Sequence, residues 1–306
     1  MSNHGYLYRK TTLILLSLFL TLQSFADGGL NTYYKVGVYQ GTMAEAIELA
    51  KAALTTADTP FEILGEYQPS KSDAMAVIAF TRSDLVNISL QIPDMGILGN
   101  ILRVGLRETS KGEIEVSLLN PEYLFYAFFR ERAEDFANEL SAISIDVRMA
   151  LFNMGQEFRP FGGYATDQEL KSFRFTADMP SFDEPVLLRE FNSFDEALST
   201  IDRNLQSRKG GSLMVFKESY PAQKVAIFGV AMHDARMGEA HFLPALGEEN
   251  LACLPYELIL QDNKAYILHG RYRLPLFWTN VSIRTHQKLY KTPRDIEETM
   301  RGLTQP

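Results

Sequence analysis

Cysteine is almost absent from this chain of 306 residues, in which Cys253 is the only one. A single cysteine cannot form an internal disulfide, so a small disulfide-stapled fold is excluded. Cys253 follows Ala252 and precedes Leu254, and a free cysteine in an apolar stretch usually behaves as a small buried residue. A reactive thiol or an intermolecular disulfide is the alternative interpretation.

Basic residues are outnumbered, with 30 Lys and Arg against 38 Asp and Glu and a net charge of −8 at pH 7. A chain this acidic should not bind nucleic acid through general electrostatic attraction. The sequence also lacks a P-loop, a nucleophile elbow, a CxxC pair and a dinucleotide-binding glycine fingerprint. None of the enzyme classes that these motifs identify is therefore indicated.

Long apolar runs are missing except near the N-terminus, where residues 11–22 are almost wholly apolar. Arg9 and Lys10 precede this run, and Ser24-Phe25-Ala26 follows it as a small-x-small cleavage pattern. These features predict a signal peptide over residues 1–26, because the run is shorter than the roughly 20 residues of a spanning helix. We expect a periplasmic or secreted protein with no transmembrane segment after cleavage; an uncleaved anchor is the alternative.

Two segments of the sequence carry the same helix-start signal. Thr42 is followed three residues later by Glu45, and Ser193 is followed by Glu196 at the same spacing. This spacing is typical of the capping box, in which the Ser or Thr side chain accepts from the backbone and the Glu reaches back. Apolar residues then recur at helical spacing, so we predict helices over 44–57 and 194–205.

Strand-like segments follow each of these helices in the same order. The pairs are 61–67 with 213–220, 76–80 with 225–228, 101–106 with 254–260, and 112–119 with 264–269. A constant order at an offset of about 150 residues indicates internal duplication. We therefore predict an α+β fold of two related sandwich-like halves, each with an antiparallel or mixed sheet and packed helices.

The predicted organisation has four parts: the signal peptide 1–26, a first α+β domain 27–155, a linker 156–184 and a second α+β domain 185–306. Residues 131–154 read as one long helix. The linker is rich in Gly and Pro, which favours a loop. It is also rich in aromatic residues, and disordered segments are poor in them, so we expect an ordered loop that packs across the domains.

The second half carries a recognisable set of segments. These are Ser193-Phe-Asp-Glu-Ala197, Val225-Ala-Ile-Phe-Gly229, Leu243-Pro-Ala-Leu-Gly247, Leu254-Pro-Tyr-Glu-Leu-Ile-Leu260 and Ala265-Tyr-Ile-Leu-His269. Over about residues 185–303 the chain resembles the domain of unknown function 302 family, small α+β domains of bacteria and archaea. The first half resembles a more divergent copy, with Asn120-Pro-Glu-Tyr-Leu124 similar to the segment after the family's last hairpin strand. The resemblance implies the fold and supplies no catalytic residues.

A candidate ligand site lies in the second half. Residues 265–274 alternate as a strand does, which places His269, Arg271 and Arg273 on one face. Three potential cations suit a carboxylate or another small anion, and Tyr256 on the preceding predicted strand completes this lining. The alternative is that the arginines pair with the protein's own acids, such as Glu257.

A candidate metal site consists of His233 and His241, because imidazole is an ordinary ligand of zinc, copper and iron. Their eight-residue separation meets no regular ligand spacing, and a shared site needs a loop between them. The cofactor is therefore unknown, with a transition metal or haem as the possibility that these histidines raise. Solvated or hydrogen-bonded histidines are the alternative.

The sequence favours an exported soluble protein that binds a small anionic ligand or a periplasmic protein partner. A metal- or haem-dependent redox or hydrolytic enzyme that uses the second-half histidines is the alternative function. A partner-binding protein that uses the aromatic segment 158–182 is a third. Whether the protein is an enzyme stays open.

Overall fold

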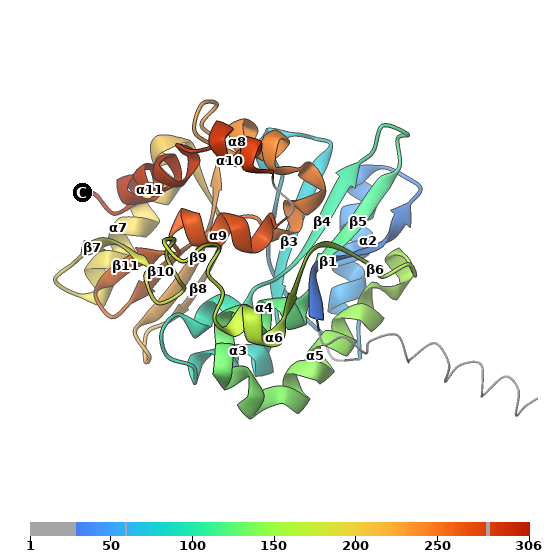
Figure 1. Cartoon of the computed structure of the whole chain (residues 1–306), viewed down its shortest axis with the longest axis horizontal. Helices are drawn as coiled ribbons and strands as arrows, with labels where there is room; N and C mark the ends of the chain where they lie inside the picture. The colour runs from blue at the N-terminus through green and yellow to red at the C-terminus, as the bar shows by residue number, and fades with distance from the viewer. Residues whose placement is uncertain (1–28, 59, 280–281) are drawn as a thin grey trace, which may run out of the picture.

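The computed structural model describes residues 29–58, 60–279 and 282–306. The predicted signal peptide lies outside this part of the chain. Two antiparallel sheets with packed helices make up the molecule, which confirms the α+β prediction (Figure 1). In these described ranges, no helix combines the length and apolar character that crossing a membrane requires.

The first sheet has six strands in the order β2-β3-β4-β5-β1-β6. Their bounds are β1 Gly29–Tyr39, β2 Glu62–Tyr67, β3 Met75–Thr81, β4 Leu102–Glu108, β5 Ile114–Leu119 and β6 Arg159–Thr166. Every residue of β3 is buried, because both faces of this strand are covered. That burial explains its continuous apolar sequence.

The second sheet has five strands in the order β7-β11-β10-β9-β8. Their bounds are β7 Val186–Glu190, β8 Ser212–Tyr220, β9 Val225–Met232, β10 Tyr256–Gln261 and β11 Lys264–Ile267. Strands β8 to β11 occupy the same places here as β2 to β5 do in the first sheet, and β7 matches β1. The four strand pairs noted in the sequence thus share a position in their sheets, while duplication as their origin stays a prediction.

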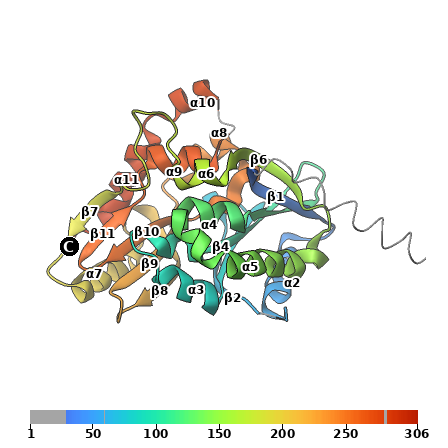
Figure 2. The same cartoon turned by 60° about the horizontal axis from the view of Figure 1, so that its bottom comes forward.

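Helices cover the sheets and connect their strands. They are α2 Met43–Thr55, α3 Ser83–Leu90, α4 Pro121–Phe129, α5 Ala137–Ala150, α6 Asp167–Lys171, α7 Phe194–Gln206, α8 Glu239–Leu246, α9 Gly270–Phe277, α10 Ile283–Lys288 and α11 Thr292–Leu303. Two short 3₁₀ helices used below are η3 Gly96–Asn100 and η7 Glu248–Cys253. Figure 2 shows α8, α9, α10 and α11 grouped on one side of the molecule.

The capping prediction is confirmed in full for α2 and in part for α7. Thr42 Oγ1 accepts from the Glu45 amide at 3.3 Å, and the Glu45 carboxylate accepts from the Thr42 amide at 2.8 Å. Ser193 Oγ caps α7 by accepting from the Glu196 amide at 3.1 Å. The Glu196 carboxylate accepts instead from the amide of Asn192, so the second bond of the capping box forms one residue early.

The two halves share one hydrophobic core. The 3₁₀ helix η7 of the second half packs on β4 of the first half, while η3 of the first half packs near β9. Gly105 on β4 permits this approach, because a Cβ there would lie 2.9 Å from Leu251 Cγ and 3.1 Å from the Ala252 nitrogen. At the other contact, a Cβ on Gly65 of β2 would lie 2.1 Å from the Val215 carbonyl oxygen of β8.

Residues 156–184, expected to be a linker or an ordered loop, begin with β6, which pairs with β1. The aromatic residues further along this segment bridge the two halves. The Phe182 ring lies 5.9 Å from Phe128 of α4 and 6.0 Å from Tyr272 of α9, centroid to centroid. Phe173 also contacts Tyr272, edge to face at 5.6 Å. The segment therefore contributes to the core as well as connecting the halves.

The prediction of one long helix over 131–154 is wrong at both ends. The chain forms a 3₁₀ helix, Arg130–Phe136, before α5 and another, Leu151–Met154, after it. Arg130 has a positive φ of 54° and Phe136 leaves the helical region at φ −126° and ψ 23°. These two backbone turns interrupt the hydrogen-bond ladder before α5, and at its other end Leu151 leaves the helical region at φ −82° and ψ 1°.

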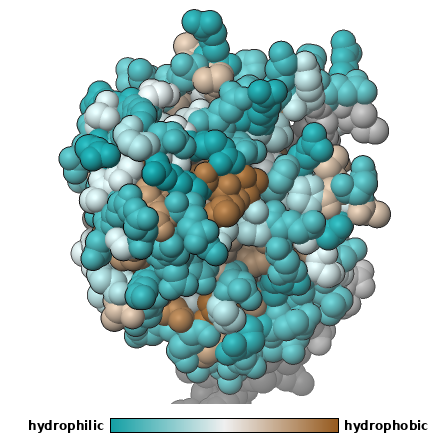
Figure 3. All heavy atoms as spheres, turned by 90° about the vertical axis from the view of Figure 1, so that its left-hand side faces the viewer, coloured by the Kyte–Doolittle hydropathy of each residue, from teal (hydrophilic) through white to brown (hydrophobic). Residues whose placement is uncertain are grey.

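Strand β7 is an edge of the second sheet. Arg301 of α11 covers part of this edge, since its guanidinium donates to the carbonyl oxygens of Leu187 and Leu188. The side of the molecule that carries β7, α7 and α11 is mostly hydrophilic, with a compact hydrophobic area near the middle of the view (Figure 3). Charged groups on an edge strand and its cover oppose pairing with another chain.

Candidate functional site

The predicted metal residues do not converge with other ligands. His233 follows β9 and is half-buried. Its pKa is lowered mainly by burial and to a smaller extent by the charge of Lys71. His241 lies on α8 with its side chain exposed. In the described ranges, no three His, Cys, Asp or Glu side chains are close enough together to hold a metal ion.

The strand prediction for residues 265–274 is wrong beyond Ile267, where β11 ends. The chain turns at His269 and forms α9 from Gly270. His269 is the N-cap, and its Nδ1 accepts from the Arg271 amide at 3.1 Å. A helix separates residues that a strand would place on one face, so Arg271 is exposed while Arg273 is fully buried.

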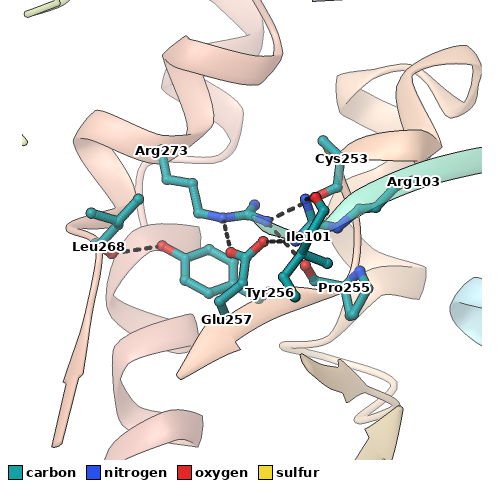
Figure 4. A network of polar contacts seen from close by, with 8 residues as sticks. All are labelled: Ile101, Arg103, Cys253, Pro255, Tyr256, Glu257, Leu268 and Arg273. Carbon is teal, nitrogen blue, oxygen red and sulfur yellow. Dashed lines mark hydrogen bonds and ion pairs between the residues drawn. The ribbon is translucent and has the colours of Figure 1, made fainter. Parts of the chain in front are cut away.

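Arg273 belongs to a buried charge network between the two halves (Figure 4). Its Nε donates to Glu257 Oε2 at 2.8 Å, and Arg103 of β4 donates to the other oxygen of the same carboxylate. Arg273 Nη2 also donates to the carbonyl oxygens of Cys253 and Pro255 at 2.8 and 3.0 Å. Arg273 therefore pairs with the protein's own acid, as the alternative interpretation held, and links α9 to both sheets.

Tyr256 also lies inside this network. Its ring lies under the Arg273 guanidinium, with 4.1 Å between the guanidinium carbon and the ring centroid. Its hydroxyl donates to the Leu268 carbonyl oxygen at 2.8 Å. The hydroxyl and one face of the ring are thus both occupied within the core, which explains why a tyrosine is tolerated there.

The electrostatics of the network are those of a closed core. Burial lowers the pKa of Arg103; the Glu257 carboxylate opposes this effect, and the neighbouring Arg273 adds to it. For Arg273, burial alone would lower the pKa, but the Glu257 carboxylate raises it above its ordinary value. Burial raises the pKa of the Cys253 thiol to about 12. The thiolate is the reactive form, so Cys253 acts as a buried apolar residue.

Arg271 and His269 border a surface hollow that we name the Arg271 hollow. Its volume is about 340 Å³, and it is lined by Val186, Ile267, His269, Gly270, Arg271, Tyr290, Pro293, Arg294 and Glu297. The first turns of α9 and α11 meet at this point, because a Cβ on Gly270 would lie 2.8 Å from the Pro293 Cα. Helix N-termini carry partial positive charge, so two of them and two arginines border the same space.

The charged side chains around the Arg271 hollow differ in whether they form ion pairs. Glu297 pairs with Arg301 at 2.6 Å and Arg294 pairs with Glu298 at 2.8 Å. Among the residues that the structure describes, Arg271 forms no ion pair within 4.0 Å. Burial and then the charge of Arg271 lower the pKa of His269. The hollow thus presents a guanidinium without a close ion pair beside an imidazole whose pKa is lowered. The exposed Asp178 has a pKa that is lowered first by its hydrogen bond from the Thr176 hydroxyl and also by the charge of Arg271.

A second hollow adjoins the first, and we name it the apolar hollow. Its volume is about 390 Å³, and it is lined by Phe175, Met179, Leu246, Gly270, Arg271, Leu274, Pro275, Leu289, Tyr290 and Pro293. Four of these residues, Gly270, Arg271, Tyr290 and Pro293, also line the Arg271 hollow. The side chain of Tyr290 is 69% exposed, so the boundary between the two hollows is open to solvent.

The first half contains a larger hollow, the α4 cavity, of about 590 Å³. Its charged lining consists of Glu122, Arg148 and Asp167. Arg148 donates to the Tyr34 hydroxyl at 2.9 Å and lies over the Tyr34 ring. Its cation is therefore engaged by the wall of the cavity, and both carboxylates are paired, Glu122 with Arg148 at 3.9 Å and Asp167 with Lys171 at 3.6 Å. The described lining of the α4 cavity therefore offers an anion only a cation that is already paired.

The sequence found two of the residues that border the Arg271 hollow, His269 and Arg271. It missed Arg294 and Tyr290, which come from α11 and the segment before it. The only signal for them was the helix start at Thr292-Pro293, which predicts a positive helix end there. Their proximity to His269 depends on the packing of α11 against α9, which no local pattern encodes.

Comparison with known proteins adds no assignment, since neither the protein-family models nor the curated proteins that were searched match this chain. The resemblance of residues 185–303 to the domain of unknown function 302 family therefore stays a prediction.

Proposed function

We propose that this chain is an exported binding protein that takes up a small anion in the Arg271 hollow. The observation that carries this proposal is the exposed Arg271 guanidinium, which has no ion-pair partner in the described ranges and lies where α9 and α11 begin. An arginine binds carboxylate and phosphate through two parallel hydrogen bonds, and helix N-termini add to the attraction. Tyr290 and Arg294 supply further donors at the rim.

The experiment is a calorimetric titration of the purified protein with inorganic phosphate and with sulfate. Arg271→Ala should weaken binding by about tenfold or more, since a hydrogen bond to a charged group contributes about 1.5–3 kcal/mol. Arg236→Ala is the matched control, because Arg236 is also an exposed arginine of the second half but lies outside both hollows. Equal binding by the wild type and the Arg271→Ala variant would reject the site.

Export is the second part of the proposal, and it is supported by the charged start, short apolar run and cleavage pattern of residues 1–26. The test is N-terminal sequencing of the protein recovered from the periplasmic fraction of an expressing bacterium. A chain that begins at Asp27 would support export. A chain that keeps residues 1–26 and stays with the membrane fraction would support the uncleaved anchor.

The alternative of a metal- or haem-dependent enzyme stays a prediction from the histidine content. Elemental analysis and an absorption spectrum of the purified protein test it directly. Stoichiometric metal that is lost in His233→Ala would favour that alternative over the anion-binding proposal.

A further inference from the structure

The Arg271 hollow and the apolar hollow share four lining residues, and we treat them together as one groove with two chemical parts. Both hollows are lined by Arg271 and Tyr290, and they differ in the chemistry of their other lining residues. One part carries His269, Arg294 and Glu297, whereas the other carries apolar side chains from four separate parts of the chain. Such a division suits a molecule with a charged head and an apolar body.

The apolar part is built by elements that are distant in sequence. Met179 comes from the segment before β7, Leu246 ends α8, and Leu274 and Pro275 lie on α9. Leu289 follows α10 and is almost fully buried. These elements lie on the side of the molecule where α8, α9, α10 and α11 gather (Figure 2). A straight alkyl chain fits such a wall because it needs no hydrogen-bond partners.

The charge around the groove favours an anionic head over a cationic one. Three acids lie near it: Glu297 pairs with Arg301, Glu184 pairs with Arg174, and Asp178 accepts from the Thr176 hydroxyl. The pKa of Asp178 is lowered first by that hydrogen bond and also by the charge of Arg271. In the part of the chain that the structure describes, Arg271 forms no ion pair within 4.0 Å, and Asp178, the acid whose pKa it lowers, is exposed. The head of the ligand therefore meets an available cation.

We propose that the ligand of this groove is an amphipathic anion with a single alkyl chain, of the fatty-acid class. Its head lies at Arg271 and its chain occupies the apolar hollow between Met179, Leu246 and Leu274. This inference rests on the proposed anion site and adds the apolar part of the ligand to it. The volume of the apolar hollow, about 390 Å³, favours a single alkyl chain over the two chains of a larger lipid.

The test is a series of calorimetric titrations of the purified protein with acetate, hexanoate, octanoate and decanoate. Each methylene that enters the apolar hollow should tighten the dissociation constant by about fourfold, from about 0.8 kcal/mol per buried methylene. The increase should stop when the hollow is full. Decanol has the same chain without the charge, and it should bind more weakly than decanoate.

Two variants separate the head from the chain. Arg271→Met removes the charge and keeps the apolar stem, so it should weaken decanoate by about tenfold more than it weakens decanol. Arg236→Met is its control and should bind decanoate as the wild type does. Met179→Trp fills the apolar hollow and should abolish the increase of affinity with chain length. An unchanged unfolding midpoint confirms that each variant is folded.

The outcomes distinguish this inference from the anion site itself. If phosphate binds in an Arg271-dependent way but decanoate binds no more tightly than acetate, the apolar part is wrong and the anion site stands. If decanoate binds equally to the wild type and to Arg271→Met, the binding is general apolar adsorption and the inference is overturned. If neither probe depends on Arg271, both proposals fail.

Discussion

Each half has a hollow at the start of an equivalent helix, and the first turn of that helix places an acid there in the first half and an arginine in the second. In the first half β5 ends at Leu119, Asn120 caps α4, and Glu122 lines the α4 cavity. In the second half β11 ends at Ile267, His269 caps α9, and Arg271 lines the Arg271 hollow. Each lining residue is the second after its cap. A shared frame can thus hold different chemistry, because an exposed first-turn residue is not constrained by packing.

The two halves also differ in the side chains that α4, after β5, and α9, after β11, contribute to the core. Arg273 of α9 enters the buried network with Glu257 and Arg103. Leu124 is the fourth residue after the α4 cap, as Arg273 is after the α9 cap, and it is a buried leucine. Charge is therefore concentrated on the second half's side of the interface, and the following predictions test how far this asymmetry decides stability and binding.

The largest expected effect is that of Glu257→Gln. This change leaves Arg103 and Arg273 buried without a counter-charge, and breaking a buried pair in this way costs about 3–5 kcal/mol of unfolding free energy. Glu115→Gln is the matched control, because Glu115 pairs with Lys35 and Arg107 at the partly exposed face of β5. It should lose about 1 kcal/mol or less. Urea denaturation measures both losses of unfolding free energy. Equal losses would show that the buried network contributes no more to stability than the partly exposed pairs do.

The next effect is the pH dependence of stability that Glu239 causes. Its carboxylate is fully buried, and it accepts from the Tyr67 hydroxyl, the Ser70 amide and the Met232 amide, which come from both halves. Burial raises its pKa from 4.5 to about 7. The folded state therefore keeps this proton at pH values where the unfolded chain has released it.

Stability should consequently fall by about 3 kcal/mol as the pH rises from about 4.5 to about 7, and this contribution should be constant above that range. Glu239→Gln cannot ionise, so the difference in unfolding free energy between wild type and variant should follow that curve. Urea denaturation at a series of pH values measures it. A difference that does not change with pH would place the pKa of Glu239 in the ordinary range.

A smaller effect is expected from the two matched helix caps. Thr42→Ala removes two hydrogen bonds to Glu45, one from its amide and one to its carboxylate. Ser193→Ala removes one, because the Glu196 carboxylate is bound to Asn192 instead. We expect losses of about 1 kcal/mol for the first and about 0.5 kcal/mol for the second. The reverse order of urea midpoints would contradict this difference between the halves.

The smallest effect is the pH dependence of anion binding through His269. Its pKa is lowered by burial and then by Arg271, while Glu297 and Glu184 raise it slightly; Arg294 and Tyr290 also border the same hollow. A bound anion favours the imidazolium, so sulfate affinity should rise as the pH falls from 7.5 through this lowered pKa. The gain should be up to about fivefold, as for an exposed ion pair.

The control for this measurement comes from the other half. His269→Asn keeps a side-chain acceptor for the Arg271 amide, as Asn120 does for the amide of Glu122 in α4. It removes the titrating group, so sulfate affinity should become independent of pH over the same range. A variant that keeps the full pH dependence would show that another group is responsible.

Much of the fold could be predicted from local patterns. The apolar alternation and the turn residues gave the strands β2 to β5 and β8 to β11, and the caps at Thr42 and Ser193 gave α2 and α7. The prediction failed at 268–274, where apolar and polar residues alternate but the chain is helical. The matching place in the first half offered the correct signal, since Asn120-Pro121 begins α4 directly after β5.

The candidate site was only half predictable. His269 and Arg271 could be named because cations are rare at the matching strand and helix start of the first half. Arg273 was assigned to the same site in error, because a helix turns neighbouring residues by about 100° each and a strand by about 180°. The apolar hollow could not be predicted at all, since its lining joins residues from Phe175 to Pro293.

The sequence by itself determined the α+β class, the order of most elements and the excess of acidic charge, because these depend on local spacing and composition. The tertiary structure alone decided that Arg103, Glu257 and Arg273 share one buried network and that α9 and α11 begin at the same point. Those outcomes depend on how η7, α9 and α11 pack across the two sheets. Packing between distant segments produces no periodic pattern in the sequence. This packing is the reason that Arg273 is buried while Arg271 is exposed.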